Sequence, residues 1–384
     1  EQLAGDMLPN ATNDQKVATG FHRNTQLNEE GGIDPLEFRF YAAVDRVATT
    51  GTVWMGLTTG CAQCHTHKYD PITHDEYFGL MSLLDNVEEP DLFLYTDEQV
   101  KVKADLEKQI AQKITELQKN DTEFEDAFKK WHKSESEKAT PWKTLRPSAM
   151  KSNLPKLEVM DDDSIYSSGD VTKRDVFDLN FTSDQPITTL RLEVLTDDRL
   201  PGQGPGRCYY EGRKGTFFLS EVDLKKSNGS KVKFAKPSAT SGNGADKVID
   251  DVGSSGWSSA IGQENHLILP LADPLPANTP FSIELLFERH FVASLGRFRI
   301  SATSSTNQPR ASKIGVEAEH ILSLKEMAKP QDLSTLRSIY LEKVYLERLV
   351  PTQPATVQKN TRWIWNAKGN RPQETFYFSK QFEL

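Results

Sequence analysis

Cys61-Ala62-Gln63-Cys64-His65 is the stretch that decides how the rest of this chain is interpreted. Cys-x-x-Cys-His is the attachment pattern of a c-type haem, in which both thiols form thioethers with vinyl groups on one edge of the porphyrin. The adjacent histidine then binds the iron. The chain has 3 cysteines in 384 residues, so two of them at this spacing favour a haem site. The pattern predicts one covalent haem c.

Two other chemistries use the same residues. A Cys-x-x-Cys pair can be a thiol–disulfide redox centre, which usually opens a helix after a buried strand, and residues 53–60 could form such a strand. The two cysteines with His65 and His67 could instead form a zinc knuckle, but a structural zinc site normally takes a second ligand pair from a distant segment. Nothing near Cys208 supplies one. We expect haem and keep both alternatives open.

Length and composition describe a protein of several domains. At 384 residues the chain can bury two or three separate cores. No run approaches the roughly 18 consecutive apolar residues of a membrane span, so we expect none. A net charge of −9 argues against nucleic acid as a partner, because phosphate binding needs basic patches.

The haem pattern also predicts a compartment. Thioether attachment of haem takes place outside the cytoplasm, so we expect an extracytoplasmic protein, in a periplasm or at a cell surface. The chain begins at Glu1 and its last residues suggest the opening of another strand. Both features suggest a segment of a larger precursor, whose other segments are then expected partners.

Residues 1–95 are expected to form a helical mono-haem domain. Asp34 is a candidate N-cap, with Pro35 at the first helical position and Glu37 closing a capping box. The apolar face of that helix should be formed by Leu36, Phe40, Val44 and Val47.

The rest of the chain divides into four segments. Residues 96–150 repeat apolar residues at helical spacing and predict a helical arm or coiled coil. Residues 151–311 alternate apolar and polar residues between turns, which predicts an antiparallel β-sandwich, galactose-binding-like in type. Residues 312–350 return to helical spacing, and residues 351–384 should form a linker and the start of a truncated β domain. The expected inward-facing strand residues include Leu190, Leu192, Val194, Phe281, Ile283, Leu285, Phe287, Phe298 and Ile300, with Arg191 and Glu193 on the opposite face.

Several motifs resemble one known family, the planctomycete-type cytochrome c proteins, which are large secreted multidomain chains of poorly known function. The matching stretches are 19–24 (TGFHRN), 28–32 (NEEGG), 45–47 (DRV), 61–71 (CAQCHTHKYDP), 200–207 (LPGQGPGR), 218–222 (FLSEV) and 295–301 (LGRFRIS). The resemblance implies haem binding and an extracytoplasmic setting without specifying a substrate. The stretch 208–214 (CYYEGRK) departs from it, where a shorter turn is expected.

The motif leaves the sixth ligand of the iron open. His65 is the expected proximal metal ligand, and His22, in a polar loop well upstream, is our candidate distal ligand. Met81, on the helix after the motif, is the alternative, and methionine would raise the reduction potential. Arg23 and Arg46 are candidate partners of the haem propionates, because Arg binds carboxylates bidentately, with a surface salt bridge as the alternative.

Three further residues near the motif have structural interpretations. His67 lies too close to His65 to reach the other face of the same ring, so it should bind the backbone or a carboxylate. His74 should adjoin the N-cap of the next helix. Met55, in the run before the motif, is expected in the core.

The function expected first is electron transfer to or from a redox partner protein. The sequence shows no distal acid–base pair of the peroxidase kind, so we favour an electron-transfer module over an enzyme. The alternative is a cell-surface scaffold whose sandwich binds polysaccharide or cell-surface proteins.

The sandwich offers candidate ligand residues for that alternative. Tyr209, Tyr210 and Trp257 could stack on sugar rings, although buried aromatics are commoner. The acidic stretches 161–163 and 250–251 are candidate calcium ligands, with solvated turns as the alternative.

Overall fold

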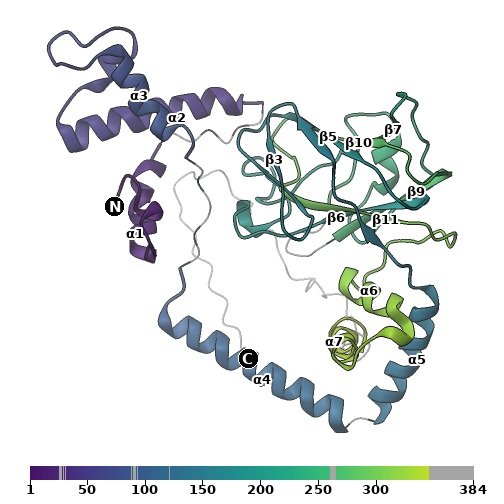
Figure 1. The fold of residues 1–384 in the computed structure, drawn as a ribbon. Coiled ribbons are helices and arrows are strands. Elements are labelled where there is room, and N and C mark those ends of the chain that lie inside the picture. The colour runs from purple at the N-terminus through teal and green to yellow at the C-terminus, as the bar shows by residue number, and fades with distance from the viewer. Residues whose placement is uncertain are drawn as a thin grey trace, which may run out of the picture.

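The computed structural model describes residues 1–345, apart from residues 26, 27, 29, 31, 88, 90, 91, 93, 121 and 260–264. The chain forms helices first, then two antiparallel sheets, then helices again (Figure 1). This confirms the expected mixed, multidomain architecture of helices and antiparallel strands. The β domain expected within 351–384 lies outside the described residues.

The N-terminal part is built on two packed helices, α2 (Pro35–Thr50) and α3 (His74–Leu84), preceded by the short α1 (Asn13–Ala18). Asp34 caps α2 as expected, accepting a hydrogen bond of 3.0 Å from the backbone N–H of Leu36. Glu37 does not complete the predicted capping box, because its carboxylate accepts a 2.7 Å bond from the Tyr41 hydroxyl. The buried core of this part comprises Ala43, Val47, Ala62, Tyr77, Met81 and Leu84.

The predicted apolar face of α2 is only partly buried. Val47 lies in the core, whereas Leu36 and Phe40 are exposed. The core contacts of α2 come from its C-terminal half, where α3 and Ala62 pack against it.

The run before the motif is not a strand. Helix α2 continues into a π-helical turn, η3 (Gly51–Met55), which ends at Gly56 in the left-handed region with φ of +63°. Gly51 permits close packing, since a Cβ there would lie 2.4 Å from Thr59 Cγ2. The turn directs Trp54 and Met55 outward, so the expected core position of Met55 is wrong.

Two antiparallel sheets pack face to face around one core. One has the order β3-β4-β11-β6-β9-β8 with β1 beside β11, and the other has the order β2-β5-β10-β7. Their strands are β1 (Lys143–Thr144), β2 (Ala149–Ser152), β3 (Lys156–Val159), β4 (Ile165–Ser168), β5 (Arg174–Phe181), β6 (Ile187–Val194), β7 (Glu221–Lys226), β8 (Ser238–Ala239), β9 (Asn265–Leu275), β10 (Phe281–Glu288) and β11 (Arg297–Thr303). The sandwich therefore begins before residue 151, because β1 and β2 each extend a sheet.

The predicted alternation holds in β10 and in β6. Every second residue of β10, from Phe281 to Phe287, is buried in the shared core. In β6, Arg191 and Glu193 lie on the opposite face from the core residues but are also buried, with 4% and 1% of their surface exposed. The outer face of β6 is therefore covered.

Helices distant in sequence provide that cover. Helix α5 (Thr122–Lys138) packs with α6 (Val316–Leu324) and α7 (Pro330–Tyr340) beside the sandwich (Figure 1). Phe124 and Phe128 of α5 share a core with residues of α6 and α7. The sequence places these helices in two separate segments, whereas the structure joins them in one helical module.

Helix α4 (Asp97–Asn120) differs from α5. Leu106 and Ile110 on its predicted apolar stripe are 52% and 57% exposed. In the part of the chain that the structure describes, no helix is long and apolar enough to cross a membrane.

A buried ionic network joins the sandwich to the helical module. Arg191 Nη1 lies 2.9 Å from Glu319 Oε2 of α6, and Arg191 Nη2 lies 2.8 Å from Glu193 Oε1. Arg299 Nη2 reaches Glu193 Oε2 at 2.6 Å, and the Trp142 indole N–H donates to Glu319 at 3.0 Å. Burial alone would raise the pKa of Glu193, but the two arginines outweigh it and hold that pKa below its usual value.

Candidate functional site

The two thiols of the motif face outward from one short turn. Cys61 lies in η4 (Thr59–Gln63), a 3₁₀ turn that Cys64 terminates, and both are free and exposed. Ala62 between them is fully buried against α2 and α3. The turn is fixed on two sides, because Thr59 Oγ1 donates to the Val47 carbonyl at 3.2 Å and His74 Nδ1 lies 3.2 Å from the Ala62 carbonyl.

His65 has the protonation pattern of a metal ligand. Its Nδ1 lies 2.8 Å from the backbone carbonyl of Thr66, and a carbonyl only accepts, so Nδ1 carries the proton. The lone pair is then on Nε2, on the side of the ring away from that bond. A hydrogen bond from the second ring nitrogen is the usual way in which ligating histidines are oriented.

His67 is engaged elsewhere, as its spacing predicts. Its Nδ1 accepts the backbone N–H of Asp70 at 2.9 Å and lies 3.3 Å from the Asp70 carboxylate. His74, also as expected, follows the N-cap of α3, Thr73. Both histidines stabilise the loop around the motif.

His22 is buried and its imidazole is unused. The residue is 4% exposed, and among the described residues neither ring nitrogen has a hydrogen-bond partner. Burial, helped by the nearby positive charge of Arg46, lowers its pKa, so the ring is neutral at pH 7. The Phe21 ring packs edge-on against both His22 and the exposed Trp54. His22 is therefore an available nitrogen ligand close to η3.

Arg23 and Arg46 converge on a protein carboxylate. Arg46 is buried, and it donates to the His22 carbonyl at 3.2 Å and to Glu89 Oε1 at 2.6 Å. Arg23 Nε lies 4.0 Å from Glu89 Oε2. The predicted site residues thus form two groups, one on the Cys61–Cys64 turn and one around Glu89, which the sequence analysis did not identify.

Met81 is an internal residue. It belongs to the core between α2 and α3, beside Tyr77 and Leu84. The hydroxyl of Tyr77 is buried without a partner among the described residues, and burial raises its pKa, as does the nearby Cys64 thiol. Tyr77 therefore lies behind the turn that carries the thiols.

The residues at the turn could hold a c-type haem. A pair of outward thiols, an oriented imidazole and the exposed apolar side chains of Trp54 and Met55 are the groups that a thioether-linked porphyrin needs. Within the described ranges, no three His, Cys, Asp or Glu side chains are grouped to hold a metal ion, so the zinc knuckle is not assembled. The thiol-redox alternative lacks its buried strand.

Two of the three aromatic residues proposed for sugar stacking are not available, while Tyr209 is half-buried. Tyr210 and Trp257 are buried, and the Trp257 indole N–H donates to the Ser241 carbonyl at 2.9 Å. The alternative, that these residues are buried aromatics, is confirmed for both Tyr210 and Trp257.

The acidic turns proposed for calcium already have partners. Their carboxylates pair with arginine, lysine or serine side chains: Asp162 with Arg297, Asp163 with Arg146, Asp250 with Ser255 and Asp251 with Lys231. These contacts show turns held by internal bonds and do not support a calcium site there.

Glu221 lies beside one of those turns. Its carboxyl group accepts the backbone N–H of Val252 at 2.7 Å. Burial, together with the carboxylate of Asp250 nearby, raises the pKa of Glu221 to about 7. Asp250 stays ionised because Ser255 and the backbone donate to it, which lowers its pKa.

This pair predicts a pH dependence of stability. The folded pKa of Glu221 lies above the 4.5 of the unfolded chain, so its stabilising contribution is complete below pH 4.5 and is lost as pH rises through about 7. We expect the Glu221→Gln variant, which cannot ionise, to lose less thermal stability than the wild type between pH 5 and pH 8. Thermal unfolding followed by circular dichroism at the two pH values measures the difference. An equal loss in both proteins would contradict the assignment.

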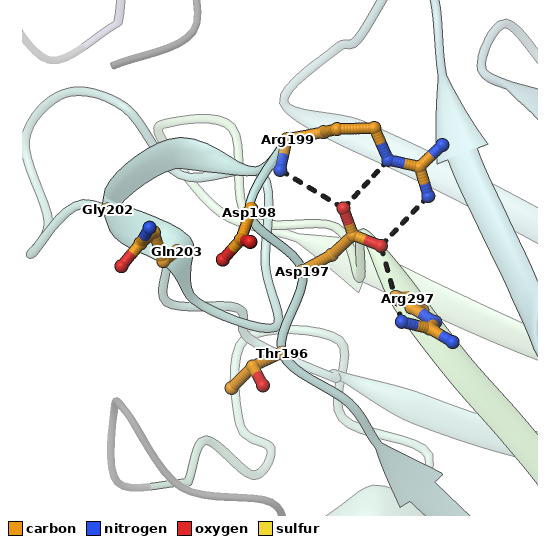
Figure 2. Close-up of a pocket in the computed structure, with 7 residues that line it drawn as sticks. All are labelled: Thr196, Asp197, Asp198, Arg199, Gly202, Gln203 and Arg297. Atoms are coloured by element: carbon orange, nitrogen blue, oxygen red, sulfur yellow. Dashed lines mark hydrogen bonds and ion pairs between the residues drawn. The ribbon is translucent and has the colours of Figure 1, made fainter. Parts of the chain in front are cut away.

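A separate pocket of about 610 Å³ opens at the end of the sandwich where β6 ends and β11 begins (Figure 2). Asp197 lies at its centre and accepts two bonds of 2.8 Å from Arg199, at Nε and Nη2. Arg297 Nη1 lies 3.4 Å from the same carboxylate. The hydrogen bonds from Arg199 are the main reason that the pKa of Asp197 is low, although burial opposes them. The dashed lines of Figure 2 all meet at Asp197, and none reaches Asp198.

Comparison with known families supports only the N-terminal part. The family model PSCyt2, described as a protein of unknown function (DUF1549), matches residues 1–89, less than a quarter of the chain. This domain is found in planctomycete cytochrome c proteins and is itself uncharacterised. No curated protein matches the chain.

Solved structures show weak likenesses. The catalytic domain of a GH87 alpha-1,3-glucanase in complex with nigerose is 11% identical over 44% of this chain, with a TM-score of 0.23, and the match spans 29% of the glucanase chain. A family IIIa CBD from Clostridium cellulolyticum is 13% identical over 45% of this chain and 94% of its own, with a TM-score of 0.17. These scores are too low to indicate a shared fold.

Proposed function

We propose that the N-terminal part, residues 1–95, is an extracytoplasmic c-type cytochrome module that carries one covalent haem and transfers electrons. Cys61 and Cys64 would form the thioethers, and His65 would be the proximal ligand. Bound haem supplies a one-electron redox centre. The acceptor and donor would be redox partner proteins.

The observation that carries this proposal is the arrangement of the Cys61–His65 turn. Ala62 anchors the turn in the α2–α3 core while both thiols point outward. The Thr66 carbonyl fixes the His65 tautomer so that Nε2 is free. The turn therefore needs no rearrangement of its buried side to present two thiols and an imidazole to the same ligand.

The test is an absorption spectrum of the reduced, denatured protein after expression in a host that attaches haem c. Covalent haem keeps its haemochrome bands after extraction of free haem, and a protein without them would contradict the proposal.

His22 is our proposed distal ligand, because its buried imidazole has no hydrogen-bond partner in the part of the chain that the structure describes. In the haem-loaded protein, His22→Ala should shift the absorption bands and raise the reduction potential, since bis-histidine ligation gives low potentials. His290→Ala, which removes an exposed histidine of the sandwich, should change neither. An unchanged spectrum in His22→Ala would remove His22 from the iron.

The alternative function, a glycan- or protein-binding scaffold of galactose-binding-like fold, loses its predicted aromatic contacts at Tyr210 and Trp257. It would need a different surface of the sandwich, such as the pocket of about 610 Å³ beside Asp197.

A further inference from the structure

The pocket at the end of the sandwich has a wall that carries both signs of charge. The lining residues include two carboxylates, Asp197 and Asp198, and two guanidinium groups, Arg199 and Arg297, of which Asp197 pairs with both arginines (Figure 2). Since these charges cancel, the pocket offers no net attraction to a simple cation or anion. It is suited to a neutral ligand with many hydrogen-bonding groups.

The wall is held in place before any ligand arrives. The Arg199 guanidinium is clamped between the Asp197 carboxylate and the ring of Tyr166, whose centroid lies 3.8 Å from Cζ. Below it the chain turns through Gly202 and Gln203, both in the left-handed region with φ of +56° and +53°. Such a fixed wall reduces the entropy lost on binding.

A glycine contact locks that turn to its neighbour. The N–H of Gly206 donates to the Gly215 carbonyl at 2.9 Å, and a Cβ on Gly204 would lie 2.2 Å from the same oxygen. Only glycine allows this approach at residue 204. The Gly-rich stretch 200–207 that the sequence analysis noted therefore shapes one side of the pocket.

Three polar side chains in the pocket remain without a partner. Within the described residues, no hydrogen bond or ion pair involves the side chains of Thr196, Asp198 or Gln203. The carboxylate accepts, while the hydroxyl and the amide can both donate and accept. Together these side chains offer both acceptors and donors, as do the vicinal hydroxyl groups of a sugar, each of which also donates and accepts.

We propose that this pocket binds a neutral carbohydrate, with Asp198 as its main acceptor. The volume of about 610 Å³ lies within the range of roughly 300–1,000 Å³ that small-ligand sites occupy. The pocket is open to solvent at the rim of the sandwich, which suits recognition of the end of a saccharide chain. The site does not depend on the haem proposal, and each can fail without the other.

The test is titration of the full chain with neutral disaccharides built from glucose, galactose, mannose or xylose, by calorimetry and ligand-observed NMR. We expect at least one to bind, and Asp198→Asn to weaken it by about tenfold or more, because a bond to a charged acceptor is lost. Gln203→Asn, which tolerates the left-handed backbone, should weaken it less. Asp273→Asn changes an exposed carboxylate of β9 outside the pocket and should leave binding unchanged.

Three results would overturn the proposal. The first is the absence of binding by every disaccharide at millimolar concentration. The second is equal binding by Asp198→Asn and Asp273→Asn when circular dichroism shows both to be folded. The third is binding of Ca²⁺ that Asp198→Asn abolishes while disaccharides have no effect, which would make the pocket a cation site.

Discussion

A Cys61→Ser, Cys64→Ser double variant should lose covalent haem completely, while a Cys208→Ser variant should keep it. The two outward thiols share one turn, whereas Cys208 is buried and its thiol donates to the Tyr210 carbonyl at 3.3 Å. Haem staining after denaturing electrophoresis measures covalent attachment directly. Cys208→Ser is the matched control, because it removes a thiol without touching the turn.

Single variants distinguish one thioether bond from two. Cys61→Ser and Cys64→Ser should each retain one thioether, so the haemochrome band of the denatured, reduced protein should shift without disappearing. Haem that stays bound to the double variant through denaturation would show that attachment lies elsewhere. Haem lost equally from Cys208→Ser would show that the loss reflects misfolding.

Glu193→Gln should reduce the free energy of unfolding of the sandwich by about 3–5 kcal/mol, because removing one charge of a buried ion pair leaves its partners uncompensated. Arg191 and Arg299 both lie within 2.8 Å of the Glu193 carboxylate. Urea unfolding followed by tryptophan fluorescence, to which the buried Trp257 contributes, measures the change. Hydrogen exchange in α6 should also rise, since Arg191 connects Glu193 to Glu319.

The control is an ion pair on the surface of the same sheet. Lys156 and Glu158 lie 2.6 Å apart with both side chains exposed, so Glu158→Gln should have no measurable effect on unfolding. Equal unfolding midpoints for Glu193→Gln and Glu158→Gln would show that the buried network contributes nothing to stability.

Local features of the fold could be predicted from the sequence because their causes are local. Asp34 and Pro35 define the start of α2 through capping and a fixed φ. The strict alternation from Phe281 to Phe287 identifies β10, since one face of that strand lies in the core and the other does not.

Features that depend on distant contacts could not be predicted in this way. The burial of Arg191 depends on Glu319, which lies 128 residues further along the chain. The exposure of Met55 depends on a π-helical turn, which no short sequence pattern predicts. At the candidate haem site the sequence identified the thiols and His65, but Glu89 was missed because its pairing with Arg46 joins segments 43 residues apart.

The pairing of β1 with β11, the first and last strands of the sandwich, has a consequence for folding during synthesis. Lys143 lies opposite Ala302, so the chain enters the sandwich and leaves it at adjacent points. In the sequence, the sandwich is an insertion between α5 and the helices α6 and α7. On a ribosome, α5 emerges first and has to keep Phe124 and Phe128 exposed until the whole insert has been made. Folding of the insert then brings α6 back to α5 and removes most of the loop-closure cost of joining them. Chaperone binding to this nascent chain should therefore concentrate on α5.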